Sequence, residues 1–151
     1  MRPHVGGLIG LLASACLWGG SAGQVELVED RDVLLLGSRI ERLYERLEGR
    51  PLAVVGTYED PRLREFFATT QDFVDYYASL TSQLREASFR HSRALRIEIR
   101  EFHFEGPDRA RVELVLVGRH FRRLRFWEVR TERTDLWQRS GSTWVVRPDR
   151  L

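Results

Sequence analysis

The chain of 151 residues contains one cysteine and neither lysine nor asparagine. A single cysteine excludes a disulfide framework and a cysteine-rich metal site. Because lysine is absent, arginine supplies all 24 basic charges, and 22 acidic residues balance them to a net charge of +2. This balance excludes an acidic or basic polyelectrolyte. We interpret abundant arginine without lysine or asparagine as the composition of a GC-rich bacterial genome.

Motifs that would indicate common enzyme classes are also missing. We find no glycine-rich phosphate-binding loop, and outside residues 1–23 no Gly-x-Ser-x-Gly nucleophile motif. The four histidines include no His-x-x-x-His pair. We therefore expect neither a metal nor a cofactor. Hydrophobic residues make up 42% of the chain and aromatic residues 11%, which excludes disorder and, at this length, indicates one domain with a substantial core.

Residues 1–23 have the layout of a secretory signal peptide. Arg2 and His4 precede an uncharged apolar run over residues 5–18, and small residues follow as far as Gly23. The run is shorter than the roughly 20 residues that a membrane-spanning helix needs. We therefore expect an exported protein, periplasmic or extracellular, that is cut before Gln24.

Cys16 offers a second way of processing this leader. The segment Leu12-Ala13-Ser14-Ala15-Cys16 resembles a bacterial lipobox, with its leucine one place earlier than usual. In this alternative the chain is cut before Cys16, and a lipid on that residue is the only attachment to a membrane. Free secretion and lipid anchoring both stay open.

The first half of the mature chain has helical spacing. A helix is predicted over about 30–48, ended by Gly49 and Pro51. Asp60 followed by Pro61 predicts a short helix over about 61–67, and a capping box, Thr69-x-x-Asp72, starts a third over about 71–88. The apolar stripe of the first helix consists of Val33, Leu36, Ile40, Leu43 and Leu47.

From residue 95 the apolar period changes to two, which predicts strands. The apolar parity flips between Ile99 and Phe102, which indicates a bulge or a bend. Later strands are predicted over about 110–116, 124–137 and 144–146. Helices followed by strands indicate an α+β fold, with three N-terminal helices on a strongly bent antiparallel sheet of about four strands. We expect a cone with an interior cavity.

Three local patterns, in this order, resemble those of the nuclear transport factor 2-like superfamily. They are Tyr58-Glu59-Asp60-Pro61 before Phe66-Phe67, Gly106-Pro107-Asp108-x-Ala110-x-Val112, and Asp135-x-Trp137-x-Arg139-x-Gly141-x-x-Trp144. The resemblance covers nearly all of residues 28–147 and implies one cone-shaped domain over 24–151. It implies no particular reaction, because the superfamily includes cofactor-free isomerases, dehydratases and hydrolases as well as binding domains.

Two function classes follow from the polar residues that could point into the cone. An acid or base there would have a shifted pKa and could move a proton without a cofactor. The catalytic candidates are Asp75, His103, Asp135 and Tyr58, paired as Asp75 with Tyr58 and His103 with Asp135. The alternative hypothesis is therefore that the protein is a cofactor-independent lyase or isomerase.

The favoured hypothesis is that the protein is a non-enzymatic binding or scaffold domain of the cell envelope. Phe73, Tyr76 and Tyr77 lie on the sheet-facing side of the third helix and would form an aromatic wall for a small apolar ligand. Neither proposed catalytic pair is fixed by spacing, which is why binding of a ligand or a partner protein is favoured over chemistry.

Residues 119–127 interleave arginines with aromatic residues. Such a stretch could bind nucleic acid, but we do not expect an exported protein to meet it. We interpret the arginines first as a solvated face of the hairpin. A patch that binds anionic lipid or a partner protein is the alternative between these two. In the predicted strand 124–137, Phe126 would point to one face of the sheet, and Trp127 and Trp137 would point to the other. Only one face can be covered by the helices, so that the other would expose large aromatic side chains. We therefore predict a homodimer through the sheet.

The leader prediction is tested by the intact mass of protein expressed in its natural host. We expect residues 1–23 to be absent, or residues 1–15 to be absent with a diacylglycerol group on Cys16. A mass that includes residues 1–15 would contradict both versions.

Overall fold

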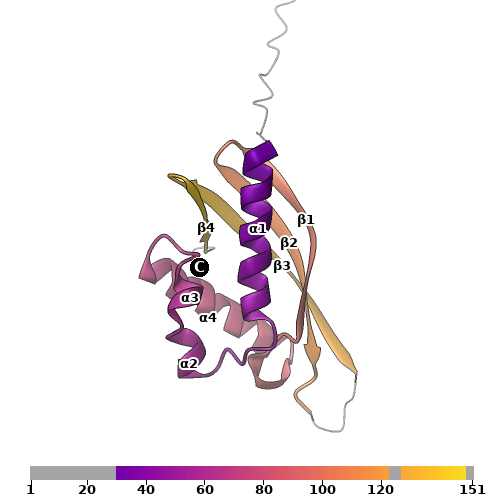
Figure 1. The fold of residues 1–151 in the computed structure, drawn as a ribbon. Coiled ribbons are helices and arrows are strands. Elements are labelled where there is room, and N and C mark those ends of the chain that lie inside the picture. Colours follow the sequence, from indigo (N-terminus) through magenta and orange to yellow (C-terminus); the bar gives the residue numbers. More distant parts are fainter. Residues whose placement is uncertain (1–29, 123–126, 149–151) are drawn as a thin grey trace, which may run out of the picture.

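The computed structural model describes residues 30–122 and 127–148 and has an α+β fold, in which four α-helices precede a four-stranded antiparallel sheet (Figure 1). The helices are α1 (Asp30–Leu47), α2 (Val55–Tyr58), α3 (Pro61–Arg64) and α4 (Thr70–Glu86), followed by a short 3₁₀ helix (Arg90–Ser92). The strands are β1 (Arg96–Gly106), β2 (Arg109–Arg119), β3 (Glu128–Ser140) and β4 (Thr143–Arg147). No helix in these ranges is long and apolar enough to cross a membrane.

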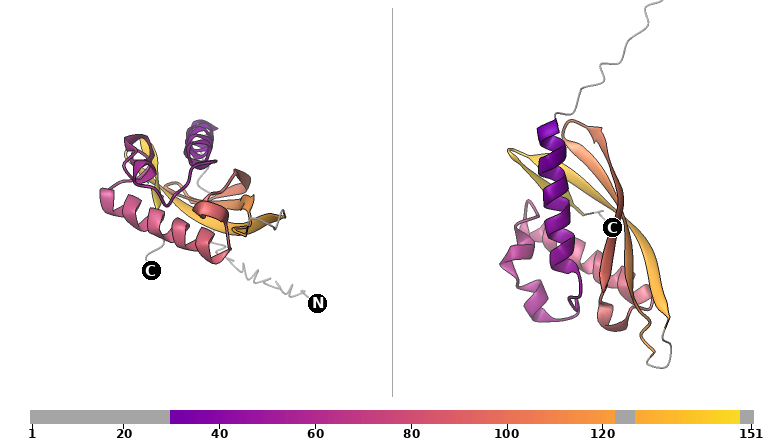
Figure 2. Two further views of the ribbon diagram at one scale, coloured as in Figure 1. Left: turned by 90° about the horizontal axis from the view of Figure 1, so that it is seen from below. Right: turned by 45° about the vertical axis from the view of Figure 1, so that its right-hand side comes forward.

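The sheet is a meander in the order β1-β2-β3-β4. In Figure 1, α1 runs lengthwise over the sheet, and α4 runs across the direction of α1; Figure 2 shows the same arrangement from below. Side chains from α1 and α4 meet the same face of β3, as described below. This face and the two helices enclose most of the hydrophobic core.

The helix ends follow the predicted capping. The side chain of Asp60 accepts a hydrogen bond from the backbone N–H of Arg62 at 2.9 Å, with Pro61 in the first helical position. Thr69 Oγ1 accepts from the backbone N–H of Asp72 at 3.0 Å. Gly49, directly after α1, has φ of +67°, a conformation that favours glycine.

Two details of the helical half differ from the sequence expectation. The helix α3 ends at Arg64 rather than near residue 67, and α2 forms where we expected only a turn. Four residues are too few to show helical spacing in a sequence. The chain after α3 instead joins the sheet, because the N–H of Val146 donates to the carbonyl oxygen of Phe66 at 2.8 Å.

The bulge predicted in the first strand is confirmed. The register between β1 and β2 shifts between Ile99 and Glu101, and pairing continues with Phe102 opposite Val112. Ile97 before the shift and Phe102 after it therefore both contribute to the core. The same shift sends Glu101 and His103 to the outer face of the sheet.

The terminal hairpin is also confirmed. Strands β3 and β4 pair antiparallel across the turn at Gly141, whose φ is +61°. Trp137 and Trp144 lie on these adjacent strands, and each is only 1% exposed.

The outer face of the sheet is covered largely by charged side chains. In register, Val115 lies between Glu98 and Glu132, and Val117 lies between Arg96 and Arg130. Both valines are buried although they are not part of the main core cluster. The stems of the long charged side chains shield this apolar layer from water.

The aromatic residues on which the homodimer prediction depends are divided by the structure. Trp137 is in the core, Trp127 precedes β3 and is 54% exposed, and Phe126 is outside the described residues. Trp137 therefore does not contribute to an exposed patch. The homodimer stays a prediction that now depends on other residues of the sheet.

Gly118 in β2 lets the segment before β1 approach the sheet. A Cβ atom there would lie 2.6 Å from Cδ1 of Phe89 and 2.8 Å from the carbonyl oxygen of Arg93. We expect Gly118→Ala to lower the free energy of unfolding by about 1–3 kcal/mol in urea denaturation. In the matched control Gly37→Ala, the added methyl group meets nothing within 4 Å, and we expect a gain of about 0.5–1 kcal/mol in α1. Equal effects of the two substitutions would contradict the close approach.

Candidate functional site

A buried carboxylate, that of Asp135 on β3, is the centre of a polar cluster. Asp135 is 3% exposed. Its Oδ2 atom accepts hydrogen bonds from the hydroxyl groups of Tyr44 at 2.8 Å and Tyr76 at 2.7 Å. Its Oδ1 atom accepts from Nε of Arg133 at 2.7 Å. Three donors from separate side chains therefore satisfy one buried negative charge.

Each member of this cluster comes from a predicted element. Tyr44 is on α1, where it borders the apolar stripe, and Tyr76 is on the core-facing side of α4 with Phe73 and Leu80. Because side chains of a strand alternate between its faces, Arg133 and Asp135 point to the same side of β3. The cluster thus joins both long helices to the sheet.

Arg133 supplies the positive charge that balances Asp135. Its Nη1 atom also donates to Oε1 of Gln83 at 2.9 Å, and its guanidinium carbon lies 4.8 Å from the centre of the Tyr76 ring. Burial disfavours the charged form of Arg133, but the Asp135 carboxylate outweighs this effect, so that the pKa of Arg133 is raised above its usual value. The guanidinium therefore stays charged.

Both tyrosines of the cluster keep their protons. Burial, and then the neighbouring charge of Asp135, raise the pKa of Tyr44 and that of Tyr76 well above the usual value for a phenol. Both hydroxyl groups are therefore hydrogen-bond donors at any physiological pH. The two phenols and the guanidinium of Arg133 therefore all donate to the same buried carboxylate.

Sequence reasoning identified Asp135 and Tyr76 but missed Tyr44 and Arg133. We had expected Asp135 to pair with His103. His103 instead lies on the outer face, 52% exposed at its side chain, with Nε2 at 3.2 Å from Oε1 of Glu101. The bulge in β1 is the cause, because it places Phe102 rather than His103 toward the core.

The second proposed pair, Asp75 with Tyr58, is not formed either. Oδ1 of Asp75 accepts from Nε2 of Gln71 at 2.7 Å, one helical turn away. The ring of Tyr58 packs on those of Phe73 and Tyr77, with centroid distances of 5.7 and 5.4 Å.

The predicted ligand-binding aromatics lie together. Phe73 and Tyr76 are buried and Tyr77 is partly buried, and the rings of Phe73 and Tyr76 both contact Phe67, at 5.3 and 5.1 Å between centroids. Among the described residues, these aromatic rings pack against one another. Contact of this wall with an apolar ligand stays a prediction.

One group of side chains has the geometry to hold a metal ion. Glu101, His103 and Glu113 each offer a ligand atom within 4.8 Å of the other two, because Glu113 lies opposite Glu101 in the pairing of β1 with β2. The group is largely exposed, and acidic groups on protein surfaces are common without an ion. Spacing along the sequence could not reveal it, because the third ligand comes from the neighbouring strand.

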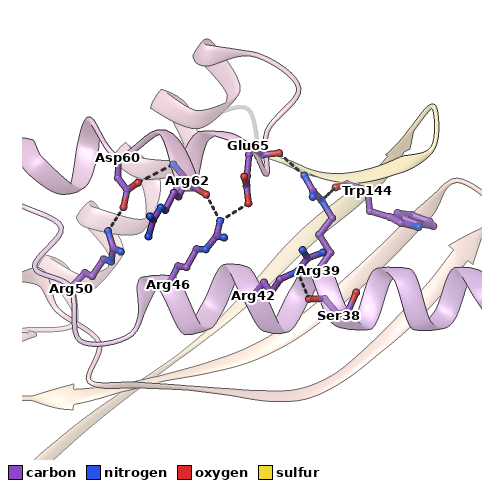
Figure 3. A network of polar contacts seen from close by, with 9 residues as sticks. All are labelled: Ser38, Arg39, Arg42, Arg46, Arg50, Asp60, Arg62, Glu65 and Trp144. Atoms are coloured by element: carbon purple, nitrogen blue, oxygen red, sulfur yellow. Dashed lines mark hydrogen bonds and ion pairs between the residues drawn. The ribbon is translucent and has the colours of Figure 1, made fainter.

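Arg46 on α1 and Arg50 just after this helix hold the segment around α3 (Figure 3). Arg50 forms an ion pair with Asp60, Arg46 forms one with Glu65, and Nη1 of Arg46 also donates to the carbonyl oxygen of Arg62 at 2.6 Å. These contacts are partly exposed, so each contributes little to stability, but together they fix the segment that leads to Phe66.

No family model, no curated protein and no solved structure matches this chain. The function is therefore argued from the residues of the chain itself.

The two tyrosine hydroxyls of the cluster can be tested separately. Because each donates to a buried charge, we expect Tyr44→Phe and Tyr76→Phe each to lower the free energy of unfolding by about 1.5–3 kcal/mol. The matched control is Tyr77→Phe, whose hydroxyl lies 3.4 Å from the carbonyl oxygen of Val54 on an exposed contact; we expect a change under about 0.5 kcal/mol. If urea denaturation gives the same small change for all three, the cluster does not carry the stability assigned to it.

Proposed function

We propose that the chain is an exported, non-enzymatic binding or scaffold domain of the bacterial cell envelope. The observation that carries this proposal is that Tyr44, Tyr76 and Arg133 all donate hydrogen bonds to the Asp135 carboxylate. A general base must accept its substrate's proton, and protein donors already occupy three of the roughly four acceptor positions of this carboxylate. The buried polar groups are thus assigned to holding the fold.

The finer fold that we propose is the cone of the nuclear transport factor 2-like superfamily. Three features support it: helix α1 lying along the sheet, the bulge in β1, and the terminal hairpin with Trp137 and Trp144. In this proposal the aromatic wall of Phe73, Tyr76 and Tyr77 lines the interior of the cone and receives a small apolar ligand.

A cofactor-independent lyase or isomerase is the second candidate function. One observation favours it, namely a carboxylate and two phenols that converge within hydrogen-bond distance in a water-poor interior. Catalysis would require space for a substrate beside Asp135. The side chains that surround Asp135 are themselves buried, with Tyr44 and Tyr76 each 2% exposed.

Substitution of Asp135 tests whether the carboxylate holds the fold. Its loss would leave the largely buried Arg133 without a counter-charge. We expect Asp135→Asn to lower the free energy of unfolding by about 3–5 kcal/mol in urea denaturation.

Asp75→Asn is the matched control for this measurement. It makes the same chemical change at the other candidate carboxylate, whose hydrogen bond to Gln71 is exposed, and we expect a change under about 0.5 kcal/mol. If Asp135→Asn were as stable as the wild type, or more stable, the carboxylate would not hold the fold, and the proposal of a scaffold domain would lose the observation that carries it.

A further inference from the structure

The segment between α4 and β1 is backbone-strained. Ser88, His91 and Ser92 have φ values of 65°, 59° and 45°, in the left-handed region that residues other than glycine rarely adopt. Such conformations persist where the surrounding structure over-determines them, and they gather at functional sites. Three within five residues therefore indicate a segment whose position matters.

Several contacts hold this strained segment against the end of β2. Phe89 is 3% exposed and forms a bridge with His120, and the N–H of Phe121 donates to the carbonyl oxygen of Ser88 at 2.9 Å. Gly118 allows the approach, because any Cβ there would collide with Phe89.

The consequence is a concentration of positive charge. Arg90 and Arg93 of the segment and Arg119 of β2 line one shallow hollow together with Leu95. A second hollow of about 240 Å³ adjoins it and shares Leu95 and Arg119.

This charge is not balanced within the described residues. No carboxylate there lies within 4.0 Å of the guanidinium groups of Arg90, Arg93 or Arg119. Glu128 lies opposite Arg119 in register, but Arg130 binds it at 3.0 Å and Arg96 approaches it at 3.9 Å. By contrast, Arg96 and Arg130, which flank Val117, both have an acidic partner in Glu98. Three arginines around one hollow favour an anionic ligand with several acceptor oxygens, such as a phosphate group.

Large apolar side chains stand beside this arginine hollow. Phe121 is 52% exposed and Trp127 is 54% exposed, and the guanidinium carbon of Arg122 lies 5.6 Å from the centre of the Phe121 ring. In Figure 1, the described parts of the chain after β2 and at the start of β3 lie beyond the end of α1. Aromatic rings next to arginines are typical of a protein surface that meets the headgroup region of a bilayer.

We propose that Arg90, Arg93 and Arg119 bind the phosphate groups of anionic lipids, with Phe121 and Trp127 inserted beside them at the bilayer surface. The hollow has a volume of only about 30 Å³, so that a phosphate group would lie at its mouth rather than inside it. The exposed aromatic side chains beside it favour a lipid phosphate over a free one. The domain thereby contacts a membrane through its folded surface, whether or not Cys16 carries a lipid. This inference does not depend on the role assigned to Asp135.

The test is sedimentation of the full chain with vesicles of phosphatidylglycerol and phosphatidylcholine, compared with vesicles of phosphatidylcholine alone. We expect binding to the anionic vesicles that weakens as salt is raised. The triple variant Arg90→Gln/Arg93→Gln/Arg119→Gln should bind about 100-fold more weakly, because each arginine at an anionic surface contributes about fivefold. The single variant Arg119→Gln, at an exposed position, should bind about fivefold more weakly and guards against misfolding of the triple variant.

A matched control removes the same charge elsewhere. Arg31→Gln/Arg62→Gln/Arg147→Gln changes three exposed arginines, on α1, α3 and β4, none of which lines the hollow, and we expect binding within about threefold of wild type. If the two triple variants lost vesicle binding equally, the binding would depend on net charge alone, and the proposed site would be wrong.

The aromatic side chains and the source of the phosphate are tested in the same way. Phe121→Ser/Trp127→Ser should weaken vesicle binding about tenfold without changing its salt dependence.

Equal binding to neutral and anionic vesicles would overturn the proposal. Calorimetric binding of inorganic phosphate without vesicle binding would identify a soluble phosphate compound as the ligand instead, and tight binding of a single-stranded oligonucleotide without vesicle binding would identify nucleic acid; either result would overturn the lipid assignment.

Discussion

One buried negative charge, that of Asp135, sets how the two long helices lie on the sheet. An isolated carboxylate in a protein interior is costly, and it is tolerated only when a counter-charge and hydrogen-bond donors surround it. Arg133 is always nearby on the same strand, but the two tyrosine hydroxyls reach Asp135 only when α1 and α4 are both docked. The charge therefore favours one arrangement of the helices over others that would bury the same apolar area.

Other contacts hold parts of the fold away from the carboxylate. Arg46 on α1 and Arg50 just after it hold the segment around α3, and the carbonyl oxygen of Phe66, after α3, accepts from the N–H of Val146 on β4. The terminal hairpin places Trp137 two residues after Asp135, on the same face of β3, where it is fully buried. The helices, the hairpin and the charged cluster therefore support one another, and the apolar stripes alone would not select their relative positions.

Local patterns predicted much of this architecture. The caps at Asp60 and Thr69 and the turn at Gly141 depend on neighbouring residues, and each is confirmed. The parity flip before Phe102 correctly predicted the bulge, and the same flip carried the information that His103 faces outward. The predicted pair of His103 with Asp135 is incompatible with this flip, because the bulge turns His103 to the outer face of the sheet. The role of Tyr44 could not be predicted, because its partner is 91 residues away and depends on the docking of α1.

The most direct test of the central role of Asp135 is hydrogen exchange on the folded Asp135→Asn variant. Without the carboxylate charge, neither tyrosine has an ionic acceptor, so α1 and α4 should open together. We expect the amide protons of both helices to lose protection by a similar factor, while those in the paired centre of β1 and β2 exchange only at the rate of global unfolding. Unchanged protection of α1 and α4 would contradict the claim that this charge holds both helices on the sheet.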